Sequence, residues 1–446
     1  MNYLPMAALS VFALTLFLMI KRPFGLRLGY TAGIGAILSL LLGTVTLTQA
    51  LQSFLDIWDA ALAFIGIVAL SVTLDAMGFF RWAALRVVHL AHGSGLRLYF
   101  YVSLLTAAVS ILFANDSAVL ILTPIVLEII TCLGITGKGK LAYLFSAGLI
   151  ADTAAMPLIT SNPINIVSAD FFEYSFVTHL TYMGPVAIAT IASSLLLVYL
   201  FFRNQIPRIY DVTSEEVLIT NRSTISSRLL KISFGTLAAI DVGYVLTSLN
   251  RIPVSLVICS GAVFLLIVYW LTLKHNSLND ESKGLVGLAK DINWDIILFM
   301  ISIFLVVQGL NTAGVTNLLA SALSTTSKFP SFLGIFAPSM VVTVGASFMN
   351  NWPMTILGLL SIKQLTVDGT VFTGLVFSNI IGNNLGPHFF PLGSLAILMW
   401  LETIRRKGVE ISLKEYLKIG SVLSIVEVAI ASIVLWAELS AFGLSL

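Results

Sequence analysis

The sequence predicts an all-α polytopic membrane protein built from two inverted-topology repeats. The 446 residues are 58% hydrophobic and 10% charged, whereas a soluble domain carries about 25% charged residues. Apolar stretches long enough to cross a bilayer recur along the whole chain. Two of them are interrupted near the middle by similar polar clusters, Ala114-Asn115-Asp116-Ser117 in the first half and Met349-Asn350-Asn351-Trp352 in the second. This pairing predicts the repeats.

Composition and missing motifs exclude several function classes. The basic residues fall in short loops between apolar stretches, so the net charge of +2 does not indicate nucleic-acid binding. Cys132 and Cys259, the only cysteines, lie in apolar surroundings, which argues against a disulfide framework or a thiol metal site. The sequence contains no phosphate-binding GxxxxGK[ST] loop, HExxH or GxSxG motif. We therefore predict a transporter rather than an enzyme, with no cofactor or resident metal.

Ten apolar stretches are candidate membrane spans, since about 20 apolar residues cross a bilayer. They are 3–20, 29–47, 58–76, 141–157, 179–202, 230–249, 253–273, 294–312, 371–390 and 419–442. The first is predicted to be a retained span rather than a signal peptide, because its charges follow the apolar run instead of preceding it. Regions 98–134 and 332–362 are predicted to be re-entrant hairpins, because arms of roughly 14 to 17 residues fall short of a crossing. The alternative for each is two full spans with a polar turn at the surface.

Loop charges orient this layout. With residue 1 outside and the hairpins opening to opposite faces, all but Arg251, Lys328 and Lys363 of the 24 Lys and Arg fall in inner loops. Such a bias marks the cytoplasmic side. Both termini are then outside, and the two repeats are inverted copies.

The predicted organisation follows from this orientation. The first repeat is 1–202, with hairpin 98–134 and broken helix 141–165; a cytoplasmic linker is 203–229; the second repeat is 230–446, with hairpin 332–362 and broken helix 371–401. Amphipathic helices are expected before the hairpins, at 79–92 and 315–328.

Broken helices at matching places are the best sequence indication of a transporter's binding site. Lipid tolerates unpaired backbone only where protein or a wet cavity covers it. The candidate substrate- and ion-binding residues are Asn115, Asp116, Ser117, Asp152, Thr153, Thr160, Ser161, Asn162, Asn350, Asn351, Asn383, Asn384, Gly393 and Ser394.

Asp116 and Asp152 are the proton-coupling candidates, because an ionisable residue within a span is costly and functional by default. The structural alternative is that Asp116 caps a half-helix. The asparagines offer both donors and acceptors, which suits a hydroxylated neutral solute as well as a carboxylate. Weaker candidates are Asp75, Glu128, Asp241, Glu427 and His388. Trp58, Trp294 and Trp352 suit interfacial anchoring, although Trp352 could instead brace the second hairpin tip.

At these motifs the chain resembles the arsenical pump membrane protein family, the arsenite and antimonite efflux permeases of the ion transporter superfamily. The matching strings are LFANDSAVLILTPIV at 112–126, ADTAAMPLITSNPINIVSADFF at 151–172, FMNNWPMTILGLLSI at 348–362 and GNNLGPHFFPLGSLAILMWL at 382–401. Distant sodium-dicarboxylate relatives carry Ser-Asn-Thr at both tips. Here those positions resemble Ala114-Asn115-Asp116 and Met349-Asn350-Asn351, so the asparagine is kept and a carboxylate is added.

The resemblance implies efflux of arsenite and antimonite across a bacterial or archaeal inner membrane by proton antiport. Because burial raises the pKa of a carboxylic acid, Asp116 could alternate between proton and substrate. The resemblance also implies an elevator motion against a scaffold of early spans, allows a soluble ATPase to dock on cytoplasmic loops such as 203–229, and leaves a homodimer open. Residue chemistry alone leaves sodium coupling open.

Rival functions are a carrier of silicic acid or a dicarboxylate, a sodium/proton exchanger, and, in a different class, a passive channel for neutral hydroxides. A dicarboxylate is disfavoured because no motif contains Lys or Arg. A membrane enzyme is the least supported, for want of a catalytic constellation.

Overall fold

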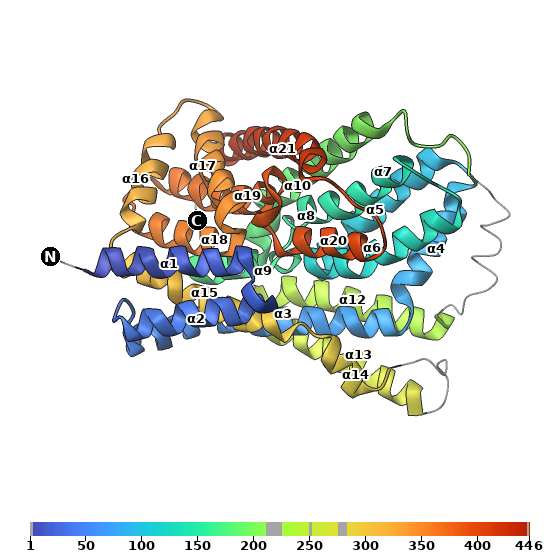
Figure 1. The fold of residues 1–446 in the computed structure, drawn as a ribbon, viewed down its shortest axis with the longest axis horizontal. Coiled ribbons are helices and arrows are strands. Elements are labelled where there is room, and N and C mark those ends of the chain that lie inside the picture. Colours follow the sequence, from blue (N-terminus) through green and yellow to red (C-terminus); the bar gives the residue numbers. More distant parts are fainter. Residues whose placement is uncertain (1–2, 211–224, 249–251, 275–282, 444–445) are drawn as a thin grey trace.

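The described part of the chain is helical (Figure 1). The computed structural model describes residues 3–210, 225–248, 252–274, 283–443 and 446. Nine helices in this part are long and apolar enough to cross a membrane, judged by length and composition. The predicted class, an all-α polytopic membrane protein, is confirmed. Residues 211–224, most of the predicted linker, lie outside the described residues, as do Arg222 and Arg251.

The first half follows the predicted order of spans, hairpin and broken helix. Its helices are α1 (Leu4–Lys21), α2 (Leu28–Leu41), α3 (Leu47–Ala76), α4 (Phe79–Ala91), α5 (Gly95–Phe113), α6 (Asn115–Cys132), α7 (Gly139–Phe145), the π turn η2 (Ser146–Ile150), α8 (Ala151–Thr153), the 3-10 turn η3 (Ile159–Ser161), α9 (Pro163–Phe172) and α10 (Phe176–Phe202), with a short 3-10 turn η1 (Pro23–Gly25) after α1.

The second half repeats the order. Its helices are α12 (Ser227–Ser248), α13 (Val254–Lys274), α14 (Leu285–Asp291), α15 (Trp294–Thr312), α16 (Thr316–Thr326), α17 (Leu333–Met349), α18 (Asn351–Lys363), α19 (Gly369–Phe389), the 3-10 turn η4 (Pro391–Gly393), α20 (Leu395–Arg406) and α21 (Leu413–Phe442).

Several predicted boundaries are wrong for local reasons. The predicted span 29–47 ends early, at Leu41, and α3 begins eleven residues before the predicted position 58. Thr46 starts α3 because its hydroxyl accepts from Gln49 N while the Gln49 side chain accepts from Thr46 N, a reciprocal cap. The first arm of the predicted broken helix 141–165 contains the π turn and ends at Thr153, a few residues before the end of the predicted stretch 141–157.

The arms of the first hairpin are longer than the prediction assumed, with 19 residues in α5 and 18 in α6, whereas those of the second have 17 in α17 and 13 in α18. In the first half, arm length therefore does not distinguish a hairpin from two spans. Burial of the tip does: Asn115 is 3% exposed and Asn350 is 4% exposed. A polar turn at the protein surface would be accessible, so the structure favours hairpins that enter the protein.

The helices form two layers (Figure 1). We call one the scaffold layer; it contains α1, α2, α3, α12, α13 and α15, with α3 packed on α13 and α2 on α15. The other, the hairpin layer, contains both hairpins, both broken helices, α10 and α21, with α17 packed on α19 and α10 on α21. Contacts of α3 with α9 and of α15 with α18 join the layers. The early spans of each half thus form one body, as the resemblance implied.

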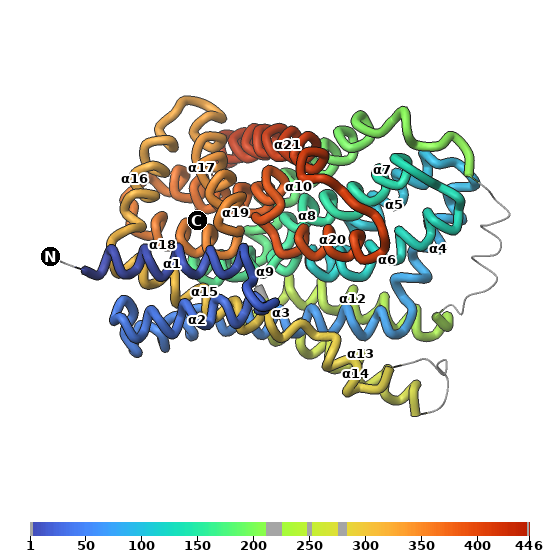
Figure 2. Tube along the Cα trace, viewed as in Figure 1, coloured from blue at the N-terminus to red at the C-terminus, as the bar shows by residue number. Residues whose placement is uncertain are grey.

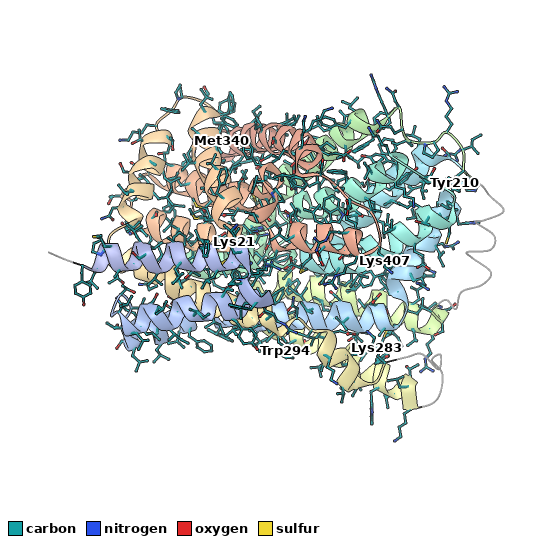
Figure 3. All side chains as sticks on the ribbon, in the orientation of Figure 1. Lys21, Tyr210, Lys283, Trp294, Met340 and Lys407 are labelled. Carbon is teal, nitrogen blue, oxygen red and sulfur yellow. The ribbon has the colours of Figure 1, made fainter. Side chains whose placement is uncertain are left out.

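The two hairpins lie toward opposite ends of the long axis, α5/α6 at one end and α17/α18 at the other (Figure 2). Lys283 and Lys407, which the charge pattern places in inner loops, lie on the same half of the axis as α4 and α5, while Lys21 lies nearer its middle (Figure 3). The arrangement brings the two buried tips toward the broken helices between them.

Candidate functional site

Both hairpin tips contain a non-glycine residue in the same unusual backbone conformation. Ala114 has φ 65° and ψ 151°, and Asn350 has φ 79° and ψ 149°. A side chain in this region costs of order 1–3 kcal/mol, and such strain clusters at functional sites. Each residue directly precedes a half-helix, so Asn115 corresponds to Asn351. The sequence alignment that paired Asn115 with Asn350 is therefore wrong by one residue.

The first tip binds the first broken helix through a carboxylate. Asn115 Nδ2 donates to Asp152 Oδ1 across 2.6 Å, and the Ser394 hydroxyl donates to the same oxygen across 3.4 Å. Asp152 is 2% exposed. At the second tip, Asn350 Nδ2 donates to the Leu392 carbonyl across 3.3 Å. Each hairpin is thereby tied to a break in a neighbouring helix.

The broken helices of the two repeats cross and exchange hydrogen bonds. Asn162 caps α9 by accepting from Ile164 N, and its Nδ2 donates to Asn384 Oδ1 across 2.9 Å. Ser394 caps α20 in the same way and reaches back to Asp152. Each capping residue follows a 3-10 turn and has an extended backbone. The crossing therefore has approximate twofold character.

Four acceptor oxygens of the predicted site residues are buried without a hydrogen-bond partner in the described part of the chain. They are Asn115 Oδ1, Asp152 Oδ2, Asn351 Oδ1 and Asn383 Oδ1. Buried polar atoms are almost always paired, so an unpaired group needs an explanation such as a bound solute or ion. A set of acceptors suits a ligand that brings donors, such as hydroxyls, or a cation.

Asp116 is buried in the first turn of α6, where the helix dipole favours a negative charge. Among the described residues we find no hydrogen bond to its carboxylate, although Asp116 and Asp152 are close enough for their charges to interact. The cap role considered for Asp116 thus has no hydrogen bond to support it. Ser117, which follows Asp116, and Thr160, in the 3-10 turn η3, are also buried.

Other predicted site residues have structural roles. The Ser161 hydroxyl donates to the Ile111 carbonyl across 2.8 Å and fixes the break to α5. Asn383 Nδ2 donates to the Asn379 carbonyl within α19. Gly393 leaves no room for a side chain, since a Cβ there would lie 2.7 Å from Pro387 Cα. The Thr153 hydroxyl donates to Glu427 Oε1 across 3.3 Å.

A buried acid–base pair lies beside the crossing and was only a weak candidate from sequence. His388 Nδ1 lies 2.9 Å from Glu427 Oε2, and both side chains are fully buried. Thr153 Oγ1 lies 3.3 Å from Glu427 Oε1. The charges of His388 and Glu427 both act on Asp152. The two residues are far apart in sequence, so only the polarity of each span could have indicated them.

Glu128 and the three tryptophans lie outside the crossing, at the surface or in the packing between the layers. Glu128 pairs with Arg81 across 3.0 Å at a half-exposed position, so it belongs to the surface. Trp352 is 6% exposed and packs edge-to-face on Phe299 of the scaffold layer, which fits a brace rather than an interfacial anchor. Trp58 and Trp294 are exposed. Among the described residues, no group of three His, Cys, Asp or Glu side chains could hold a metal ion.

The fold and the crossing of broken helices define a multi-pass membrane transporter. A solved structure with a similar fold is that of the YdaH transporter of Alcanivorax borkumensis, which has a TM-score of 0.57, 15% identity, and coverage of 89% of this chain and 88% of that one. The family model for "Arsenical pump membrane protein" matches residues 7–439.

Curated relatives agree. The arsenical pump membrane protein of Escherichia coli strain K12 is 37% identical over 419 residues, covering 93% of this chain and 95% of the relative. That of Yersinia enterocolitica is 37% identical over 417 residues, with the same coverage. The chain belongs to the arsenical pump membrane protein family.

Proposed function

We propose that this protein exports arsenite and antimonite in exchange for protons. The observation that carries the proposal is the buried Asp152 carboxylate, held between Asn115 of the first hairpin and Ser394 of the opposite repeat. Protonation or ligand binding at this carboxylate therefore changes hydrogen bonds to both repeats at once. Family membership supports the arsenical substrate, because the relatives are named for it.

The chemistry of the substrate fits the crossing. Trivalent arsenic and antimony hydroxides are largely neutral near physiological pH and carry several O–H donors. The four buried acceptor oxygens that lack a hydrogen-bond partner among the described residues are suited to such donors. None of the predicted site residues is a Lys or Arg, which disfavours a dianionic substrate, since a buried charge needs a partner.

Exchange follows because a proton and a substrate hydroxyl compete for one oxygen of Asp152. Asp152 Oδ1 is used by Asn115 and Ser394, whereas Oδ2 has no partner among the described residues. Oδ2 can hold a proton or accept a substrate hydroxyl, but not both. If Asp152 takes up a proton from outside and a substrate molecule from inside, proton entry is coupled to substrate export. Asp116, whose charge interacts with Asp152, is the second coupling candidate.

The wider proposals concern motion, orientation and partners. The hairpin layer is proposed to move against the scaffold layer as an elevator, with both termini outside the inner membrane. A soluble ATPase docking on the linker and a homodimer remain part of the proposal, and sodium coupling is the alternative to protons.

Arsenite uptake into everted membrane vesicles with an acidic interior and no ATP tests the proposal. We expect uphill accumulation that a protonophore abolishes. Dependence on a sodium gradient instead would change the coupling ion. Downhill equilibration alone would contradict antiport and indicate a channel, and absence of arsenite movement in intact vesicles containing the protein would overturn the substrate.

A further inference from the structure

The His388–Glu427 pair is a buried pair of ionisable groups that the proposed exchange does not use. His388 lies near the end of α19 and Glu427 within α21, and the two helices pack on each other (Figure 1). Both side chains are fully buried, whereas no Lys or Arg is buried in the described part of the chain. A buried charge needs a partner of opposite sign. His388 is therefore placed to neutralise Glu427.

The contacts around the pair favour an imidazolium and a carboxylate. Glu427 faces donors: His388 Nδ1 lies 2.9 Å from Oε2, and the Thr153 hydroxyl is shared between Oε1 and the Leu149 carbonyl, at 3.3 and 3.1 Å. His388 faces acceptors on both edges of its ring. Nε2 makes no hydrogen bond of normal geometry among the described residues, but the Leu149 carbonyl is near enough to act on the ring. An imidazole with an acceptor at each edge is best satisfied when both nitrogens carry a proton.

His179 has the opposite arrangement. It is also fully buried, but its Nδ1 lies 3.3 Å from the Tyr174 hydroxyl and its Nε2 lies 2.9 Å from the Met156 carbonyl. A hydroxyl can donate, so a neutral ring with its proton on Nε2 satisfies both contacts. No described carboxylate acts on this ring. The chain thus contains an internal reference for a neutral buried imidazole.

The charge of His388 extends to the exchange carboxylate. Thr153, which contacts Glu427, directly follows Asp152 in the chain. His388 acts on Asp152 more strongly than Glu427 does, so the pair as a whole acts on that carboxylate as a positive charge. A nearby positive charge favours the ionised form of a carboxylic acid. The pair therefore affects how tightly Asp152 holds its proton.

Few other ionisable groups face the pair. Tyr416 of α21 lies beside it and donates its hydroxyl to the Pro387 carbonyl across 3.0 Å, and a phenol is neutral near neutral pH. Of the other elements packed on α19, α17 and η4 contain no ionisable residue. Those of α18 and α9, Lys363 and Asp170, do not act on His388. The charges that act on the ring are those of Glu427 and Asp152.

We propose that Glu427 holds His388 as a buried imidazolium whose positive charge determines the pH at which Asp152 exchanges its proton. His388 is thus a positioning residue that acts through Asp152. The imidazolium follows from the contacts of the ring, whereas its effect on exchange rests on the proposed antiport. The two parts are tested by separate measurements.

Nuclear magnetic resonance measures the charge of the ring without transport. In purified protein with isotope-labelled histidine nitrogens, the chain has five imidazoles, and the signal absent from His388→Gln belongs to His388. At neutral pH we expect both nitrogens of His388 to carry a proton, whereas one nitrogen of His179 carries none. Glu427→Gln should return the His388 ring to a neutral form, and this change assigns the signal if His388→Gln fails to fold. A His388 ring that is neutral in the unmodified protein, or that stays charged in Glu427→Gln, would overturn the proposal.

Arsenite uptake into everted vesicles with an acidic interior measures the effect on exchange. Without the imidazolium, Asp152 holds its proton more tightly, so a less acidic interior suffices. We expect the interior pH for half-maximal uptake to rise by about one unit, a ten-fold change in proton concentration, in Glu427→Gln. His388→Gln should shift it in the same direction. The double variant should match Glu427→Gln, because that change alone already removes the charge of the ring.

Glu438→Gln is the matched control, because Glu438 lies on the same helix as Glu427 and does not act on Asp152. It should leave the half-maximal pH unchanged. A pair with only a structural role would lower the rate of uptake at every pH without moving the half-maximal pH, and that result would refute the role in exchange. If the wild type shows no gradient-driven uptake, the antiport fails, while the imidazole signals still decide the charge of His388.

Discussion

Asp152 and Asn384 occupy corresponding positions in the two repeats and differ chiefly in the ionisable group. Each lies ten residues before the residue that caps the next half-helix, Asn162 or Ser394. Each also accepts a hydrogen bond from the capping residue of the other repeat. The crossing is therefore nearly symmetric in hydrogen bonding but asymmetric in charge, so only the first repeat can hold a proton at this position.

Replacing Asp152 by Asn should abolish uptake driven by the pH gradient and preserve the fold. An amide oxygen can still accept from Asn115 and Ser394, but it cannot exchange a proton. Uptake into acid-interior vesicles measures the loss, and exchange of labelled arsenite at equal pH on both sides should persist.

The swapped variant Asp152→Asn/Asn384→Asp should be compared with Asp152→Asn alone. We expect it to recover part of the gradient-driven uptake, because the two positions correspond. Gradient-driven uptake at the wild-type rate in Asp152→Asn alone would remove this residue from the coupling step.

Ala114→Gly should stabilise the protein by about 1 kcal/mol, because glycine relieves the positive φ at the tip. Thermal unfolding in detergent measures the effect. Asn350→Gly should gain less, since Asn350 also accepts from Trp352 N and donates to the Leu392 carbonyl.

Ala118→Gly, in the interior of α6, should instead destabilise by about 1 kcal/mol. Equal effects of the three changes would mean that the tip conformation carries no strain.

Removing one partner of the buried pair should be costly. Glu427→Ala leaves His388 without its partner and should destabilise by about 3 kcal/mol or more, whereas Glu427→Gln, which can keep a hydrogen bond, should cost less. Glu438 on the same helix is the control, because its buried Oε2 has no partner in the described chain.

Glu438→Gln should be neutral or stabilising for that reason. Denaturation in mixed detergent micelles ranks the three variants. A Glu427→Ala protein as stable as Glu438→Gln would show that the pair does not hold α19 to α21.

Two glycines should respond to alanine with opposite signs. A Cβ at Gly420, in α21, would collide with the His388 carbonyl oxygen, and the rigid backbone there cannot yield, so Gly420→Ala should destabilise by about 1–3 kcal/mol.

Gly235, inside α12, has nothing within 4 Å of its Cβ position, so Gly235→Ala should stabilise by up to about 1 kcal/mol through helix propensity. Thermal unfolding of both variants checks the pair, and a stable Gly420→Ala protein would mean that α21 and the end of α19 are not in close contact.

The helical class, the hairpins and most of the polar positions could be predicted from the chain. Segments such as α13 are apolar throughout, and the clusters at Asn115 and Asn351 interrupt apolar runs too abruptly to be ordinary spans. Boundaries were less predictable, because α3 starts at the reciprocal Thr46–Gln49 cap, a side-chain pairing that hydropathy does not contain. The register of the tips also needed backbone angles, since Asn350 and Asn351 are adjacent asparagines and either could match Asn115.

By itself the sequence determined that this chain is a membrane transporter with two interrupted hairpins, because lipid forces every exposed span to be apolar and every break to be covered by protein. Only the tertiary structure decided which polar side chains meet. Asn162 and Asn384 are 222 positions apart, and the His388–Glu427 pair depends on how α19 packs on α21. Such contacts follow from the packing of whole helices, which no local pattern of residues specifies.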